Sequence, residues 1–186
     1  MSDRIAAHGW RVVAPDLFDG ASRLGSLFAL PARLARCEGR VFDIAAEAIG
    51  EESQRGPSAV IGLSLGAAVA LRLPLQVPVV AAYGHVPRGI RATGPILGVY
   101  GTGDPLVARS GRRLQLHPHA DVRWFEGAGH SFLVDPEVGL PMRLPGFGPH
   151  PAAELAWSDI VAFLDHHFGD PVENALTRAT RNGPKV

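Results

Sequence analysis

Three side chains that could together perform nucleophilic catalysis each follow an apolar run: Ser64, Asp104 and His130. A serine hydroxyl is a poor nucleophile until a base within hydrogen-bond reach takes its proton. A histidine can act as that base, and a carboxylate can hold its tautomer and stabilise the imidazolium. We therefore expect acyl-transfer chemistry with Ser64 as nucleophile, His130 as base and Asp104 as acid.

The strongest local signal surrounds the serine, because residues 62–66 read Gly-Leu-Ser-Leu-Gly. This matches G-x-S-x-G, the nucleophile elbow of α/β-hydrolases, in which a tight turn joins a strand to a helix. Residues 59–63 indicate a buried strand, and alanines at 67, 68 and 70 would let the next helix pack close to the sheet. We expect a strained backbone at Ser64, and collisions for any side chain at Gly62 or Gly66. The alternative is a serine in a glycine-rich turn that does no chemistry.

The acid and the base each have a competing interpretation. Asp104 precedes Pro105, so it could also serve as a turn former. His130 lies within Gly-Ala-Gly-His-Ser-Phe directly after a predicted strand, where a solvated surface histidine is the alternative. Asp16 precedes the elbow in the chain and is better explained as structural, and Asp135 is a weaker spare acid. The order Ser, Asp, His is that of the α/β-hydrolases and of neither unrelated serine protease fold.

Metal and cofactor sites are not expected. His117 with His119, and His166 with His167, form pairs without an obvious third ligand. Cys37 is the only cysteine, so no intramolecular disulfide or thiolate cluster can form. No glycine run completes a dinucleotide fingerprint or a phosphate loop.

Composition limits the partners. Lysine plus arginine and aspartate plus glutamate number 18 each, which gives no electrostatic case for nucleic acid or an anionic membrane. No apolar run approaches a membrane span and no signal peptide is apparent, so we expect no membrane partner and a cytoplasmic location. A chain of 186 residues fits one domain, predicted at 1–169 with a polar tail at 170–186.

Apolar runs alternate with helical patterns along the chain, which predicts an α/β fold with a doubly wound, mainly parallel sheet. Ligands bind such sheets beyond the carboxyl ends of the strands, where all three candidate residues fall. The predicted strands are 12–14, 59–63, 77–83, 95–100 and 121–125. The predicted helices are the end of one over 1–8, then 41–49, the elbow helix, 108–116 and 151–168, with polar residues 51–57 leading back to the elbow strand. Residues 135–151 hold five prolines and three glycines, which indicates a loop that could cover the site.

Four blocks of the chain resemble the dienelactone hydrolase family: residues 6–18, 62–66, 100–104 and 126–132. The resemblance covers most of the chain and implies an α/β-hydrolase fold with Ser64, Asp104 and His130 as the triad. The founding members of the family use cysteine as nucleophile, whereas many relatives use serine.

Two features depart from the family pattern. Gly20 and Val134 stand where the founding enzymes place arginines that grip a substrate carboxylate, so a neutral ester, lactone or thioester is easier to defend than a dienelactone. Relatives also have roughly twenty more residues before Met1, which carry a strand and a second oxyanion donor. We expect an N-terminally truncated sheet in which the strands at 11–14 and 58–63 lack this neighbour. The remaining oxyanion donor would be the Leu65 backbone N–H.

The sequence therefore favours a serine hydrolase that cleaves a small ester or lactone. The alternatives are a thioesterase on the same triad and a catalytically impaired hydrolase fold that binds a ligand. We expect no cofactor, a small-molecule substrate and a monomer or homodimer. The predicted pocket residues are Phe18, Tyr83, His85 and Phe132.

Overall fold

The computed structural model describes residues 2–17, 39–134 and 146–169. Five helices and four strands have described bounds. The helices are α1 (Ser2–Ala7), α3 (Arg40–Arg55), α4 (Leu65–Arg72), α5 (Ala108–Leu114) and α6 (Ala153–Phe168). The strands are β1 (Val60–Leu63), β2 (Val79–Ala82), β3 (Ile96–Gly101) and β4 (Ala120–Phe125). The four strands form one parallel sheet in the order β1-β2-β3-β4.

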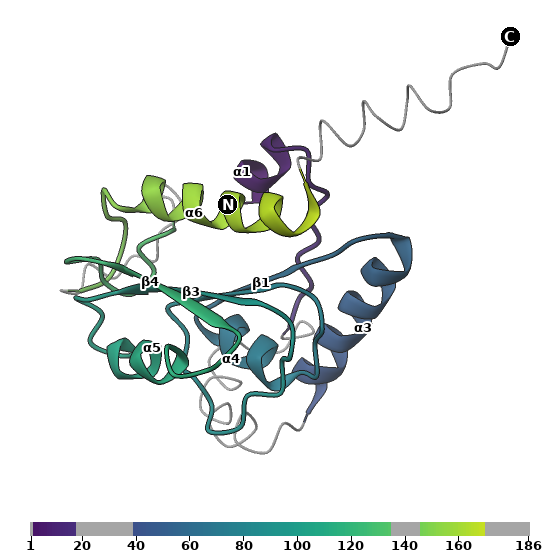
Figure 1. Cartoon of the computed structure of the whole chain (residues 1–186), viewed down its shortest axis with the longest axis horizontal. Helices are drawn as coiled ribbons and strands as arrows, with labels where there is room; N and C mark the ends of the chain where they lie inside the picture. The colour runs from purple at the N-terminus through teal and green to yellow at the C-terminus, as the bar shows by residue number, and fades with distance from the viewer. Residues whose placement is uncertain (1, 18–38, 135–145, 170–186) are drawn as a thin grey trace, which may run out of the picture.

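Helices cover both faces of this sheet (Figure 1). Helices α3, α4 and α5 lie on one side, and α1 and α6 lie on the other. Parallel strands need such cover, because their connections run across the faces of the sheet. The structure thus has the predicted α/β fold, with the sheet between two helical layers.

The core lies around the middle strands. Every residue of β2 and β3 is buried, as the continuous apolar run Val79 to Ala82 predicts. The end strand β4 instead alternates between exposed and half-buried side chains, with Asp121 and Arg123 forming an ion pair at 2.8 Å on its exposed face. The elbow helix α4 packs closely, because Ala67, Ala68 and Ala70 are at most 2% exposed.

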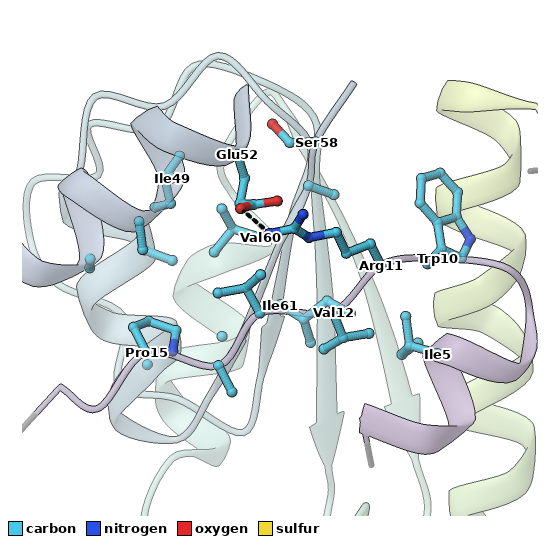
Figure 2. Close-up of a pocket in the computed structure, with 18 of the residues that line it drawn as sticks. Ile5, Trp10, Arg11, Val12, Pro15, Ile49, Glu52, Ser58, Val60 and Ile61 are labelled. Atoms are coloured by element: carbon cyan, nitrogen blue, oxygen red, sulfur yellow. Dashed lines mark hydrogen bonds and ion pairs between the residues drawn. The ribbon is translucent and has the colours of Figure 1, made fainter. Parts of the chain in front are cut away.

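The predicted strand at 12–14 is wrong. These residues are not part of a strand in the structure, and Val12 and Val13 are 38% and 47% exposed. A strand needs a neighbour with which to share its backbone hydrogen bonds. A groove lies between the segment 10–15 and β1 (Figure 2), and residues of both line it. Val12 and Val13 are of a type that favours strands, but no strand in the described part of the chain pairs with residues 12–14.

Helix boundaries follow the sequence signals with one exception. Gly9 adopts φ +84° and its N–H donates to the Ala6 carbonyl oxygen, so it ends α1 as predicted. Helix α3 continues to Arg55, although polar residues 51–57 were expected to lie outside it. Glutamate, glutamine and arginine are good helix formers, and the helix stops at Gly56 before Pro57. No helix in the described ranges is both long and apolar enough to cross a membrane.

Candidate active site

The strand-to-helix turn at Ser64 has the strained geometry expected of a nucleophile elbow. Ser64 adopts φ +50° and ψ −108° between β1 and α4, which few residues other than glycine tolerate. A Cβ at Gly62 would lie 2.6 Å from the backbone nitrogen and Cα of Ala67, so glycine is required there. The same expectation for Gly66 is wrong, because a Cβ there would meet nothing within 4 Å. The tight approach is between β1 and the start of α4, and Gly66 already lies within the helix.

A continuous hydrogen-bonded chain joins the three predicted triad residues. Ser64 Oγ lies 3.0 Å from His130 Nε2, and His130 Nδ1 lies 2.8 Å from Asp104 Oδ2. The side chains of His130 and Asp104 are 9% and 0% exposed. Burial in a low-dielectric interior strengthens such charge-assisted contacts and makes each partner costly to remove. This arrangement lets His130 accept a proton from Ser64 while Asp104 fixes the ring.

The loop after β3 holds Asp104 in place. Its second oxygen, Oδ1, accepts hydrogen bonds from the backbone N–H groups of Leu106 at 2.8 Å and Val107 at 3.1 Å. Asp104 therefore acts as a turn former and as the partner of His130 at once, each role using a different oxygen. Its carboxylate is therefore held by hydrogen bonds within the chain.

The loop after β4 presents His130 through contacts with a second segment, residues 146–148. The His130 N–H donates to the Gly146 carbonyl oxygen at 2.6 Å, and the Gly148 N–H donates to the His130 carbonyl oxygen at 2.9 Å. The Phe147 ring lies 5.5 Å from the imidazole, centroid to centroid. These contacts hold the backbone of His130 at both its N–H and its carbonyl oxygen.

Phe147 is a neighbour of the site that the sequence reasoning missed. It stands between Gly146 and Gly148, which adopt φ +79° and φ +100°. The sequence signal that could have indicated Phe147 is an aromatic residue between two glycines within a proline-rich loop. The structure describes residues 146–151 of the predicted covering loop, and the rest of that loop lies outside the described residues.

The four predicted pocket residues occupy different environments. Tyr83 is 1% exposed, and its ring meets the His130 ring edge-on at 5.2 Å. Phe132 is fully buried and packs against Tyr83 at 5.9 Å. His85 is exposed, with Nδ1 3.4 Å from Ser110 Oγ on α5. Phe18 lies outside the described residues, so a pocket role for these four residues remains a prediction.

Two buried tyrosines, Tyr83 beside His130 and Tyr100 on β3, differ in their hydrogen bonding. Burial raises the pKa of both Tyr83 and Tyr100 well above the ordinary value, so both phenols stay protonated. The Tyr100 hydroxyl donates to the Gly84 carbonyl oxygen at 3.0 Å. For the buried Tyr83 hydroxyl, no partner is found within the described part of the chain.

Among the remaining candidate residues that the structure describes, the histidines contact one another in pairs and form no group of metal ligands. In residues 2–17, 39–134 and 146–169, no three histidine, cysteine, aspartate or glutamate side chains are grouped to hold a metal ion. The rings of His117 and His119 pack together at 5.7 Å, and those of His166 and His167 at 5.0 Å. The spare acid Asp135 and Cys37 lie outside the described residues.

Two comparisons with known proteins identify a family and a similar fold. The sequence model of the Dienelactone hydrolase family matches residues 1–168. A crystal structure of an inferred dienelactone hydrolase from Klebsiella pneumoniae subsp. pneumoniae MGH 78578 has a similar fold, with a TM-score of 0.53 and 18% sequence identity. The similarity covers 78% of this chain and 68% of that one. A comparison with curated proteins finds no match.

Proposed function

We propose that this chain, which belongs to the dienelactone hydrolase family, is a serine hydrolase that cleaves a small ester or lactone through Ser64, His130 and Asp104. The observation that carries the proposal is the chain of contacts from Ser64 Oγ to His130 and from His130 to Asp104, at 3.0 and 2.8 Å. Family membership supports a hydrolase. The contacts support the three roles, because a nucleophile, its base and the base's carboxylate must lie within hydrogen-bond distance of one another in that order.

The first chemical step would be attack on a carbonyl carbon. Ser64 Oγ forms a bond to that carbon while its proton passes to His130 Nε2. Asp104 accepts a hydrogen bond from the Nδ1–H and stabilises the imidazolium. The imidazolium then gives its proton to the leaving alkoxide, which leaves an acyl-Ser64 ester. A water molecule then attacks the acyl carbon while its proton passes to His130. The carboxylic acid product leaves, and His130 returns the proton to Ser64 Oγ.

The negative charge that develops on the substrate oxygen needs a donor. Leu65 is the first residue of α4, where backbone N–H groups have no partner inside the helix. We therefore assign its N–H to the oxyanion, with support from the positive end of the helix dipole. One such donor typically contributes about 10²–10³ in turnover.

The proposed substrate class rests on two positions at which the sequence departs from the family pattern. Gly20 and Val134 stand where the family's founding enzymes carry carboxylate-binding arginines, so the proposal is a neutral ester or lactone. A thioester would react by the same steps, and a panel of acetyl, butyryl and thioacetyl substrates distinguishes these classes.

The proposal is tested by labelling the protein with a fluorophosphonate probe, which reacts with an activated serine. We expect labelling of the unchanged chain, and its loss in Ser64→Ala. Ser53→Ala is the matched control, because Ser53 is an exposed serine of α3 that hydrogen-bonds to Ser58. Absence of labelling in a folded protein would favour the competing hypothesis of a hydrolase fold that binds a ligand without turnover.

A further inference from the structure

A short segment late in the chain, residues 146–148, pairs with the loop that carries the base. Phe147 and His130 form an isolated parallel bridge outside the four-stranded sheet. The His130 N–H donates to the Gly146 carbonyl oxygen at 2.6 Å, and the Gly148 N–H donates to the His130 carbonyl oxygen at 2.9 Å. The backbone of His130 is therefore bound to this segment in the way that parallel strands pair.

Close backbone contacts place the segment between two loops of the site. A Cβ at Gly129 would lie 2.1 Å from the Gly146 carbonyl oxygen and 2.8 Å from its Cα, so any other residue there would displace the segment. The segment also meets the loop after β3, because a Cβ at Gly146 would lie 3.1 Å from both the Gly103 carbonyl oxygen and Pro105 Cδ. It thus contacts both the loop that holds the acid and the loop that holds the base.

The side chain of Phe147 lies against the imidazole of His130. The two ring centroids are 5.5 Å apart at an interplanar angle of 56°, and Phe147 is half-buried. The buried Tyr83 ring meets the same imidazole at 5.2 Å. Packing of this kind restrains the rotation of a side chain, since an imidazole that turns must displace its neighbours.

Rotation of this imidazole would interrupt the proposed proton transfer. His130 Nε2 lies 3.0 Å from Ser64 Oγ, and Nδ1 lies 2.8 Å from Asp104 Oδ2. A displacement of about 1 Å takes either pair of atoms beyond hydrogen-bond distance. Asp104 holds the ring at Nδ1 alone, so the neighbouring rings must limit its rotation about that contact.

We propose that Phe147 is a positioning residue for His130: the segment 146–148 holds the backbone of the base, and the Phe147 ring holds the imidazole in line with Ser64 Oγ. The inference rests on the proposed serine hydrolase function. A positioning role acts on the proton transfer, so it predicts a lower kcat with KM unchanged. A side chain that touched the substrate would change KM instead.

The kinetic test compares two substitutions in the turnover of p-nitrophenyl acetate. In Phe147→Ala the ring contact is lost, and we expect kcat to fall about 10–100-fold with KM unchanged. Leucine restores most of the packed volume, so Phe147→Leu should recover most of this loss and remain about threefold below the unchanged protein. Both variants should match its circular dichroism spectrum.

Phe163→Ala is the matched control. Phe163 on α6 is also half-buried, and its ring also lies against a histidine, His167, at 4.6 Å. Its kcat and KM should equal those of the unchanged protein. A similar loss of kcat in this variant would show that the removal of any half-buried phenylalanine beside a histidine lowers activity, which would overturn the inference.

A second measurement follows His130 without substrate. The proton on Nδ1 that Asp104 accepts should give a downfield NMR signal that exchanges slowly with water. In Phe147→Ala, freer rotation of the ring should make this exchange at least tenfold faster, whereas Phe163→Ala should leave it unchanged. This readout depends on the position of the base and needs no turnover.

The two readouts separate this inference from the proposed function. If the folded, unchanged protein neither turns over the ester nor reacts with the fluorophosphonate, the proposed function fails, and faster Nδ1 exchange in Phe147→Ala still supports the positioning role. A higher KM with kcat unchanged would make Phe147 a substrate contact, and unchanged kinetics with unchanged exchange would make it a surface contact. Either result overturns the inference. If Phe147→Ala does not fold, Phe147→Leu decides, and a kcat equal to that of the unchanged protein overturns it.

Discussion

The carboxyl end of the sheet and the outer edge of β1 differ in how completely their polar groups are paired. At the carboxyl end, Asp104 uses both oxygens and His130 uses both ring nitrogens and both backbone groups. At the edge, β1 borders a groove lined largely by apolar residues and pairs with a strand on one side only within the described sheet. The side chains of the first region are held by several hydrogen bonds each, whereas the second region is an open groove.

Ser64 lies where these two regions meet, because β1 leads directly into the elbow. The contacts that orient the triad come from the loops after β3 and β4, on the other side of β2. The structure therefore teaches that Asp104 follows an inner strand, whereas Ser64 and His130 follow the two end strands of the described sheet.

The largest expected effect comes from Asp104→Asn, which tests whether the carboxyl end works as a pre-arranged unit. Two backbone N–H groups require an oxygen at the Oδ1 position, so the new amide group would face His130 Nδ1. The ring would then carry its proton on Nε2, the wrong tautomer to accept one from Ser64. We expect turnover of a p-nitrophenyl ester to fall by about 10³–10⁴.

Asp121→Asn is the matched control for that substitution. Asp121 is an exposed carboxylate on β4 that forms an ion pair with Arg123, which is also exposed, and exposed pairs contribute about 0–1 kcal/mol. Its turnover should equal that of the unchanged protein. A loss of less than tenfold in Asp104→Asn would show that another group sets the tautomer of His130.

The next effect concerns the elbow, where Gly62→Ala and Gly66→Ala form a pair. A Cβ at Gly62 would overlap the Ala67 backbone, which cannot move without shifting α4. We expect a loss of about 3 kcal/mol in the free energy of unfolding by urea titration. Gly66 lies inside α4 with open space around it, so alanine should raise the free energy of unfolding by about 0.5–1 kcal/mol. Equal effects of the two substitutions would contradict the close strand–helix approach at Gly62.

The triad geometry could be predicted from the sequence because parallel strands direct their carboxyl ends to one edge. Ser64, Asp104 and His130 each follow a strand, and β1 to β4 are in chain order across the sheet. The buried strands β2 and β3 are continuous apolar runs, so their assignment needed no knowledge of neighbours.

What the sequence could not give depends on contacts between distant segments. Residues 12–14 have strand-forming side chains, but a strand exists only where a second one pairs with it. The free space around Gly66 and the contact of Phe147 with His130 depend on how closely two segments approach. Local patterns specify residue types and periodicity, and they contain no such distances.

The smallest effect concerns the buried Tyr83 and Tyr100, which are the only tyrosines in the chain. Tyr100→Phe removes a donor and leaves the buried Gly84 carbonyl oxygen without it, so we expect a loss of about 1–2 kcal/mol in the free energy of unfolding. Tyr83→Phe removes a buried hydroxyl with no partner in the described part of the chain, so the free energy of unfolding should stay equal or rise by up to about 1 kcal/mol.

The same pair of variants predicts a difference at alkaline pH. Burial raises the pKa of both folded phenols, whereas in the unfolded chain they ionise near pH 10. Their contribution to stability is complete below about pH 10 and is lost as pH rises towards the folded pKa, at about 1.4 kcal/mol per pH unit for each tyrosine. Each substitution should therefore make the fall in unfolding free energy above pH 10 less steep by that amount. An unchanged slope in Tyr83→Phe would mean that the Tyr83 hydroxyl reaches solvent. The carboxyl end of the sheet would then be more open to water than the 1% exposure of Tyr83 indicates.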